Sequence, residues 1–188
     1  MKRPKGFTLI ELLVVISIIS ILCTIMLPSL DYAKRLAREV TCRGGLHAIA
    51  IGWKMYLNDN QCQLPEAAGL PVAPEDISIA NVLKGYVNDK SNWRCPSDDR
   101  DYFTTYGISY EYYPGLLMTA NPTLKPILED LFKVEEAPYA IFGDAEPFHP
   151  RAGVPLGRLC VYQDGRVDIL EIEVAEEQYV KVKGMETP

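Results

Sequence analysis

The sequence predicts an α+β protein in which a long amino-terminal helix crosses a membrane and then packs on an exported head built on an antiparallel sheet. Residues 7–27 carry a single charge in 21 positions, whereas residues 44–188 carry 12 basic and 22 acidic side chains. The chain has 188 residues, 48% of them apolar, which suits one domain of ordinary size. Its formal charge of −6 argues against a basic nucleic-acid-binding protein, so no nucleic-acid partner is expected.

The apolar run from Phe7 to Leu27 has the length and composition of a membrane-spanning helix. At ~1.5 Å per residue such a helix spans about 32 Å, close to the ~30 Å hydrocarbon thickness of a bilayer. Its hydroxyl side chains can bond back to the carbonyl groups of the helix, and no amphipathic period is present. We therefore predict a single transmembrane helix.

Basic residues flank both ends of this run, so counting them does not orient the span. The group after the run includes acid–base pairs four residues apart, Asp31 with Arg35 and Glu39 with Arg43. This spacing is typical of a solvated helix with salt bridges. We therefore place the short basic leader on the cytoplasmic side and expect the acidic remainder to be exported.

Glu11 is the one charge inside the apolar run. A carboxylate at membrane depth typically costs ~2.5–3.5 kcal/mol at a helix centre, and less toward an end. Glu11 therefore either reaches the interface or requires a partner.

The segment around this acid, GFTLIELLVVI, resembles the processing site of type IV pilins and type II secretion pseudopilins. The matching residues are Gly6, where the leader ends, Phe7 as the new amino terminus, Glu11 as the fifth mature residue, and Pro28 at the family's helix-weakening position. An ordinary signal peptide is cleaved after its apolar stretch. Here the small residue precedes that stretch, so cleavage would leave the helix attached.

The resemblance implies that a prepilin peptidase cuts between Gly6 and Phe7 and methylates the new amine of Phe7. It also implies that Phe7, Glu11 and Pro28 act in assembly. Within a filament Glu11 would pair with the Phe7 amine of a neighbouring subunit, because a buried ion pair costs less than two buried lone charges. Pairing of Glu11 with its own amine and helix dipole is the alternative, and the sequence leaves both open. The expected organisation is a leader at residues 1–6, a transmembrane and polymerisation helix at 7–27, a stem helix at 28–57 and an exported α+β head at 58–188.

The stem is predicted to continue the same helix to about residue 57, where Asn58-Asp59-Asn60 favours a turn. Apolar residues at spacings of three and four predict a stripe that covers a sheet: Leu36, Val40, Leu46, Ile49, Trp53 and Tyr56. Gly44-Gly45 predicts a local bend. Pro28 lacks an amide hydrogen and predicts a kink or local melting near residues 24–28.

Patterns in the head predict a mixture of short helices and strands. A helical face is expected at Ile79, Leu83, Tyr86 and Val87, and a second short helix at residues 121–134. Strands are expected in the aromatic tract from Tyr102 to Tyr113 that Pro114-Gly115 closes, at Tyr139–Gly143, and in a hairpin that joins Leu159–Gln163 to Arg166–Ile172 through Asp164-Gly165.

Most of the chain also resembles pilin-like proteins that carry a His-x(n)-Asp-Gly motif near the carboxyl end. The matching stretches are Thr41-Cys42 through Leu46, Tyr56 to Asn60, Cys95-Pro96-Ser97-Asp98, Thr105-Tyr106-Gly107, Phe142-Gly143-Asp144, and His149 with Asp164-Gly165. Fourteen residues separate His149 from Asp164, more than is usual in the family. The resemblance therefore does not place His149 beside Asp164.

Of the five cysteines, Cys23 lies in the span and is expected to act as a small apolar side chain. Cys42, Cys62, Cys95 and Cys160 belong to the exported part, where disulfides persist, and allow three pairings. The resemblance favours Cys42 with Cys95, since both fall in matching stretches, and such a bond would contribute ~2–4 kcal/mol. No zinc site is expected, because the chain has no CxxC and only two histidines.

Acidic side chains gather at Asp98, Asp99 and Asp101, with Asp144, Glu146 and Asp164 elsewhere. Major pseudopilins carry a calcium site, so the resemblance raises that alternative. The D-x-D-x-D-G pattern is missing, and we favour a solvated loop and no cofactor.

Cys160 or Ser109 with His149 would be the candidates for nucleophilic catalysis. No GxSxG, phosphate loop or metalloprotease helix accompanies them. We therefore expect a protein that is not an enzyme.

The resemblance implies a structural subunit of a type II secretion pseudopilus or a type IV pilus, held in the inner (cytoplasmic) membrane with a periplasmic or extracellular head. The implied partners are the peptidase and methylase, copies of the chain and other pilin-like subunits, the lipid bilayer, a membrane platform and a separate assembly ATPase. The alternative is a membrane-anchored surface binding protein that does not polymerise and uses the tyrosine tract as its ligand face. Cross-strand aromatic packing explains that tract more simply.

Overall fold

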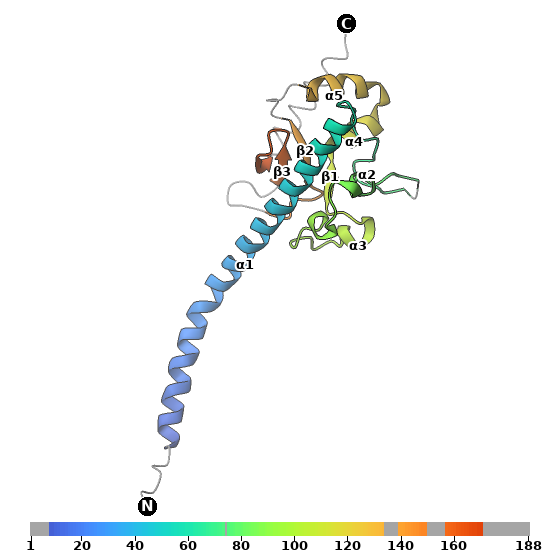
Figure 1. Ribbon diagram of the computed structural model, residues 1–188. Helices are drawn as coiled ribbons and strands as arrows, with labels where there is room; N and C mark the ends of the chain where they lie inside the picture. Colours follow the sequence, from blue (N-terminus) through green and yellow to red (C-terminus); the bar gives the residue numbers. More distant parts are fainter. Residues whose placement is uncertain (1–7, 74, 134–138, 150–156, 171–188) are drawn as a thin grey trace, which may run out of the picture. The chain divides into compact units, whose positions relative to one another are not determined.

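The computed structural model of the protein describes residues 8–73, 75–133, 139–149 and 157–170. Its contacts divide the chain into two units, Met1–Ala37 and Arg38–Pro188, each of which is described by itself. Helix α1 (Leu9–Asp59) belongs to both and contains one segment long and apolar enough to cross a membrane (Figure 1). The long amino-terminal helix predicted from the sequence is therefore confirmed.

In the first unit, α1 satisfies its interior hydroxyl groups within the helix. The hydroxyls of Ser17, Ser20 and Thr24 each donate to the carbonyl oxygen four residues earlier, at 2.7, 2.7 and 2.8 Å. α1 continues through Pro28 without a break, so the predicted local melting does not occur. Pro28 removes one backbone hydrogen bond, but helix formation is cooperative and the turns on either side keep theirs.

In the second unit, α1 presents one apolar face to the core. Leu46, Ile49 and Trp53 are fully buried, as predicted. Leu36 and Val40, which were assigned to the same stripe, are instead 49% and 60% exposed. The apolar stripe predicted from the sequence therefore extends further along α1 than the face that packs on the core. The core contacts the helix only from Cys42 onward.

The glycine pair of α1 does not break the helix. A Cβ atom at Gly45 would lie 2.7 Å from the backbone oxygen of Asn92, whereas Gly44 has no atom within 4 Å of that position. Gly45 therefore allows the backbone of a neighbouring element to approach the helix closely. The structure thus shows a close contact between α1 and the segment around Asn92, and the local bend stays a prediction.

The sheet of the second unit has four antiparallel strands in the order β1-β2-β3-β4. The strands are β1 (Tyr110–Tyr112), β2 (Ala140–Asp144), β3 (Arg158–Tyr162) and β4 (Val167–Leu170). The predicted β3–β4 hairpin is present, with Gly165 at φ 89° in its turn. Residues 171–172 of its expected second arm lie outside the described residues. The α+β fold class is confirmed.

Short helices lie between the strands and α1 in the chain, among the described residues of the second unit. They are α2 (Ile79–Val82), η1 (Leu83–Gly85), η2 (Lys90–Trp93), α3 (Tyr102–Tyr106), α4 (Tyr113–Ala120), η3 (Pro122–Leu124) and α5 (Lys125–Phe132). The helices predicted near residues 79 and 121–134 are therefore present. The prediction of a continuous β tract from Tyr102 to Tyr113 is wrong, since β1 is the only strand within this range. Pro114 opens α4 instead of closing a strand, as suits a residue whose φ is preset for the first helical turn.

Aromatic rings join the helices to the sheet in the core. Trp53 of α1 meets Phe132 of α5 edge to face, with ring centroids 5.3 Å apart. Phe142 of β2 packs against Tyr112 at 5.1 Å and against Trp93 at 6.1 Å. Rings at these separations are typical of stabilising aromatic pairs. The core of the second unit is thus formed between the carboxyl-terminal part of α1, the sheet and the helices that follow.

Candidate functional site

Two reciprocal hydrogen bonds cap the amino-terminal end of α1. The Thr8 amide donates to Glu11 Oε2 at 2.8 Å, and the Glu11 amide donates to Thr8 Oγ1 at 3.3 Å. The Thr8 hydroxyl also donates to Glu11 Oε2, at 2.7 Å. This is a capping box, in which a Thr and a Glu three residues later satisfy the free amides of the first turn. The predicted cleavage residues Gly6 and Phe7 lie outside the described residues.

Neutral donors hold the carboxylate of Glu11, and a cation is not among them. Among the described residues, no basic side chain forms an ion pair with Glu11. An amide and a hydroxyl satisfy lone pairs of the carboxylate but leave its charge uncompensated. The geometry therefore keeps one anionic group at the end of the apolar helix, where a positively charged group can still pair with it.

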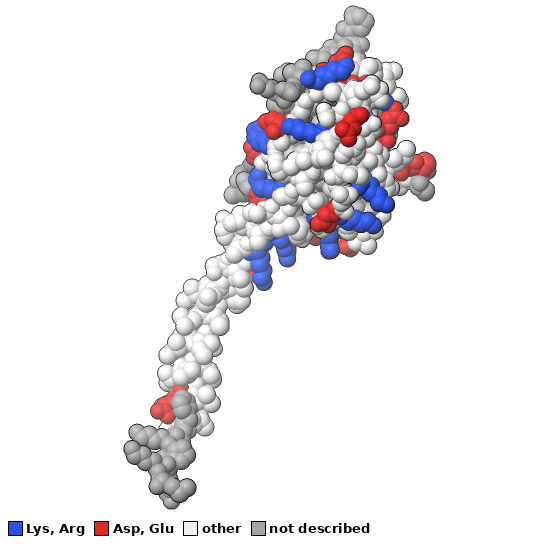
Figure 2. Space-filling model, in the orientation of Figure 1, with Lys and Arg blue, Asp and Glu red and all other residues white. Residues whose placement is uncertain are grey.

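Beyond Glu11, the first part of α1 exposes a long apolar surface. Its large apolar side chains from Leu9 to Leu30 are between 45% and 82% exposed. Apart from Glu11, Figure 2 shows this stretch free of charged side chains, whereas basic and acidic side chains gather over the second unit. An apolar surface of this size on one helix requires lipid or another protein surface as its surroundings. Pro28, which was assigned to assembly, lies within this helix.

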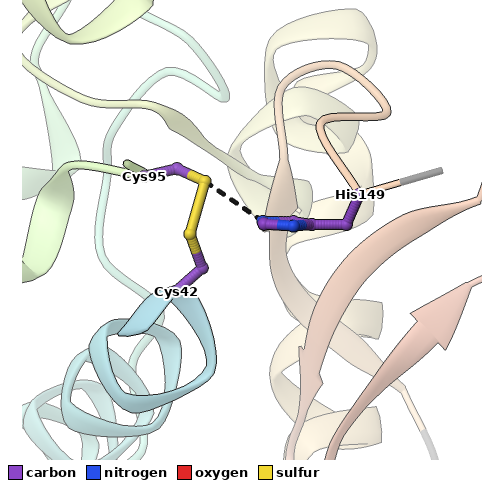
Figure 3. Close-up of side chains that lie close together, drawn as sticks. All are labelled: Cys42, Cys95 and His149. Atoms are coloured by element: carbon purple, nitrogen blue, oxygen red, sulfur yellow. Dashed lines mark hydrogen bonds between the residues drawn. A yellow bond between two sulfur atoms is a disulfide. The ribbon is translucent and has the colours of Figure 1, made fainter. Parts of the chain in front are cut away.

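A disulfide joins α1 to the segment after η2. Cys42 and Cys95 form it, with their Cα atoms 5.2 Å apart and a sequence separation of 53. This is the pairing that the second resemblance favoured. Both residues are buried, and His149 lies beside them, with its Nε2 3.2 Å from Cys95 Sγ (Figure 3).

The candidate nucleophiles Ser109 and Cys160 each have a hydrogen-bond partner other than the histidine that was assigned to them. The Ser109 hydroxyl donates to Asp98 Oδ2 at 2.8 Å. The sulfur of Cys160 lies 3.3 Å from the Tyr113 hydroxyl, and burial raises the pKa of this thiol to about 12. His149 contacts Cys95. A thiol with so high a pKa is a poor nucleophile at neutral pH, so this arrangement does not support the catalytic alternative.

The acidic loop organises the backbone around α3. Asp98 accepts hydrogen bonds from the amides of Tyr102 and Phe103, at 3.2 and 2.9 Å, besides the hydroxyl of Ser109. These donors use the lone pairs that a cation would need. Asp99 and Asp101 belong to the same loop, and the absence of a cofactor stays a prediction.

Asp144 is the one fully buried acid of the described core. Its Oδ2 accepts from the amide of Leu159 at 3.0 Å, and burial raises its pKa from the ordinary 3.8 to about 8. The sequence did not single out this effect, because Asp144 stood there as one acid among many. Its position at the end of a buried strand is the signal that was missed.

Two further contacts of α1 with the hairpin were also missed. Arg43 pairs with Glu39 at 2.9 Å and donates to the backbone oxygen of Val167 in β4. The His47 Nδ1 lies 3.1 Å from the backbone oxygen of Gly165. The sequence showed the Glu39–Arg43 spacing, but a contact with a backbone carbonyl more than 100 residues away leaves no pattern in it.

The features above define a class of protein, an α+β protein with an acid-capped apolar amino-terminal helix. The family model described as "Prokaryotic N-terminal methylation motif" matches residues 1–27. The type IV wide pilus major component PilA4 of Thermus thermophilus is 35% identical over 95 residues, which cover 50% of this chain and 72% of that protein. The ComG operon protein 3 homolog of Bacillus licheniformis is 31% identical over 95 residues, covering 50% of this chain and 84% of that protein.

The competence protein ComGC of Bacillus subtilis is 29% identical over 110 residues, which cover 58% of this chain and 99% of that protein. No solved structure gives a significant match. The chain belongs to the type IV pilin-like family, as its amino-terminal motif indicated.

Proposed function

We propose that this protein is processed between Gly6 and Phe7, methylated on Phe7, and assembled through α1 into a filament of the type IV pilus or type II secretion pseudopilus class. Before assembly it is held in the inner (cytoplasmic) membrane with its head exported. A prepilin peptidase, a membrane platform, other pilin-like subunits and an assembly ATPase are its partners. Similarity to a type IV wide pilus component and to two competence proteins supports a pilin-like subunit.

The observation that carries the proposal is the carboxylate of Glu11 at the start of an exposed apolar helix, which forms no ion pair with a basic side chain in the part of the chain that the structure describes. The capping box gives Glu11 two neutral donors from Thr8 in the single chain. Removal of residues 1–6 would create an ammonium group at Phe7, next to Thr8. Neither the ammonium nor the carboxylate is well solvated in lipid, and a buried pair costs less than two separate buried charges.

Filament assembly would give the Phe7 ammonium group and the Glu11 carboxylate an oppositely charged partner. The apolar faces of neighbouring helices replace lipid around α1, and the ammonium of one subunit pairs with Glu11 of the next. The tyrosines of β1 are fully buried, so their rings serve the core and are not available as a ligand face. No observation favours the non-polymerising surface binder, and one filament-forming function is proposed.

Variants at positions 8 and 11 separate capping from ion pairing. Glu11→Gln keeps an oxygen that accepts from the Thr8 amide but removes the charge, whereas Thr8→Val removes the hydroxyl and keeps the charge. We expect sheared filaments to be lost in Glu11→Gln and in Glu11→Ala, and to be retained in Thr8→Val. Normal filaments from Glu11→Gln would overturn the proposed role of the ion pair.

The amino terminus of the mature protein tests processing directly. Mass spectrometry of the membrane-purified chain should find that MKRPKG is absent and that Phe7 carries a methyl group. An intact Met1 in cells that process such leaders would contradict the proposal.

A further inference from the structure

Three ligand-type side chains meet in the core of the second unit. The two sulfur atoms of Cys42 and Cys95 and the ring nitrogen of His149 lie within 4.8 Å of one another. Figure 3 shows the imidazole of His149 pointing at the disulfide from the segment after β2, with Cys42 on α1 on the opposite side. The residues come from three separate parts of the chain, and the fold alone brings them together.

The contact between His149 and the disulfide fixes a proton in the oxidised state. A disulfide sulfur carries no hydrogen, so in the 3.2 Å contact with Cys95 Sγ the donor is the Nε2–H of His149. The three side chains are nearly removed from solvent, with exposed fractions of 0% for Cys42, 1% for Cys95 and 6% for His149. Because the imidazole of His149 contacts Cys95, reduction of the disulfide to two thiols changes its hydrogen-bond partner.

Reduction changes this cluster from a covalent cross-link into a set of metal ligands. Two thiolates and one imidazole are ligands that zinc prefers, and three protein ligands leave one position for water or another donor. Such ligand atoms lie about 3.5–4 Å apart when they share one tetrahedral ion, as the 2.0–2.3 Å ligand bonds require. The 4.8 Å limit that encloses the present cluster is compatible with this separation.

We propose that Cys42, Cys95 and His149 form a redox-controlled binding site for one Zn²⁺ ion, which is occupied when the disulfide is reduced. A dithiol reductant transfers two electrons and two protons to the disulfide, giving two thiols in the protein and a disulfide in the reductant. Zn²⁺ then displaces the two thiol protons, and His149 offers the Nε2 lone pair after its ring proton moves to Nδ1. In the reverse direction a disulfide oxidant accepts the two electrons and leaves as a dithiol, the Cys42–Cys95 bond forms again, and the ion is released.

The site would link α1 to the segment after η2 in two chemical forms, a disulfide and a zinc complex. The disulfide ties α1 to the segment after η2 where the surroundings are oxidising. The zinc ion ties the same two segments, and also the segment after β2, while the thiols are reduced. The disulfide restrains segments 53 residues apart in the sequence, and the zinc ion would also restrain segments 54 residues apart, so either state limits the unfolded chain.

The test uses the full chain in detergent micelles, with and without reduction under anaerobic conditions. Co²⁺ serves as the spectroscopic probe and Zn²⁺ as its competitor. The reduced protein should bind one Co²⁺ with sulfur-to-metal charge-transfer and tetrahedral absorption bands that Zn²⁺ abolishes. The oxidised protein should show no such bands. Zn²⁺ should also raise the melting temperature of the reduced protein, since a ligand of the folded state stabilises it.

The two histidines of the chain supply a matched pair of variants. His149→Gln should weaken binding at least about tenfold, the loss that even an outer-shell partner of a metal causes. His47→Gln should leave it unchanged, because His47 contacts the turn of the hairpin. The Cys42→Ser/Cys95→Ser double variant measures the background Co²⁺ binding by the other thiols of the chain.

Three outcomes would overturn the proposal. They are binding by reduced wild type no stronger than this background, equal binding by His149→Gln and wild type, and binding that leaves the melting temperature of the reduced protein unchanged. The last result would mean that the ion is held by unfolded chain.

Discussion

The two parts of α1 both carry large apolar side chains but expose them to a different degree. In the first unit its apolar side chains are about half exposed or more, whereas in the second unit Leu46, Ile49 and Trp53 have no exposed surface. The first part is regular because it satisfies its own hydrogen bonds, and the second because a core packs against it. The most apolar segment of the chain is therefore the one that contributes least to the stability of the head. Its apolar surface is available to lipid or to neighbouring subunits.

Loss of the disulfide should give the largest effect in this comparison. The Cys42→Ser/Cys95→Ser variant should lower the free energy of unfolding of the head by about 4 kcal/mol, because the bond closes a loop with a sequence separation of 53. Cys23→Ser, at an exposed free cysteine of the first unit, should change it by less than about 0.5 kcal/mol. Urea unfolding in micelles, followed by the fluorescence of the buried Trp53 and Trp93, measures both. An equal loss of unfolding free energy in the double variant and in Cys23→Ser would show that the two units do not differ in stability.

A set of isoleucines on α1 sharpens the comparison. Ile49→Ala should cost about 3 kcal/mol, since this side chain is fully buried and its loss leaves a cavity. Ile51→Ala, two residues away and 49% exposed, and Ile19→Ala in the first unit should cost less than about 1 kcal/mol. The same urea titration compares them. A cost at Ile19 similar to that at Ile49 would mean that the first unit shares the core.

The buried acid should make the stability of the second unit depend on pH. The pKa of Asp144 rises from 3.8 to about 8 in the folded protein, so between these values the folded state binds the proton more tightly than the unfolded state. The free energy of unfolding contributed by this group is therefore highest below about pH 4 and falls as the pH rises through 8. Asp144→Asn should flatten the slope between pH 5 and 7 by up to about 1.4 kcal/mol per pH unit. Identical slopes for wild type and variant would contradict the buried, protonated carboxyl.

The glycine pair should give the smallest effects, of opposite sign. Gly45→Ala should destabilise the head by about 1–2 kcal/mol, because its Cβ would lie 2.7 Å from a backbone oxygen that cannot easily move. Gly44→Ala has open space and should stabilise the helix by up to about 1 kcal/mol. Thermal melts followed by circular dichroism resolve this difference. Stabilisation by both variants would mean that the contact with Asn92 is looser than described.

Residues with local or periodic signals were predicted correctly. The apolar run and the Asn58-Asp59-Asn60 turn bounded a helix that the structure places at Leu9–Asp59. The Asp164-Gly165 dipeptide located the β3–β4 hairpin, because a turn with positive φ selects glycine. The family motif added Glu11 and the pairing of Cys42 with Cys95, which short-range patterns alone left open.

Other predictions failed because tertiary contacts decided the outcome. Tyrosines favour strands, yet Tyr102 and Tyr106 lie in α3, where the ring of Tyr102 packs edge to face on Phe148 with centroids 6.0 Å apart. Val40 continues an apolar stripe, but the core does not extend to it. Such outcomes depend on which segments pack together, and a local pattern does not contain that information.

The sequence by itself determined the long apolar helix, the hairpin and the family, because each depends on residues that are adjacent or regularly spaced. Only the tertiary structure decided which face of α1 is buried, why Gly45 must lack a side chain, that Asp144 holds its proton, and that His149 meets the disulfide. These features require segments that are not adjacent in the sequence to come within a few ångströms. Their energies come from desolvation and close packing, which exist only after the chain has folded.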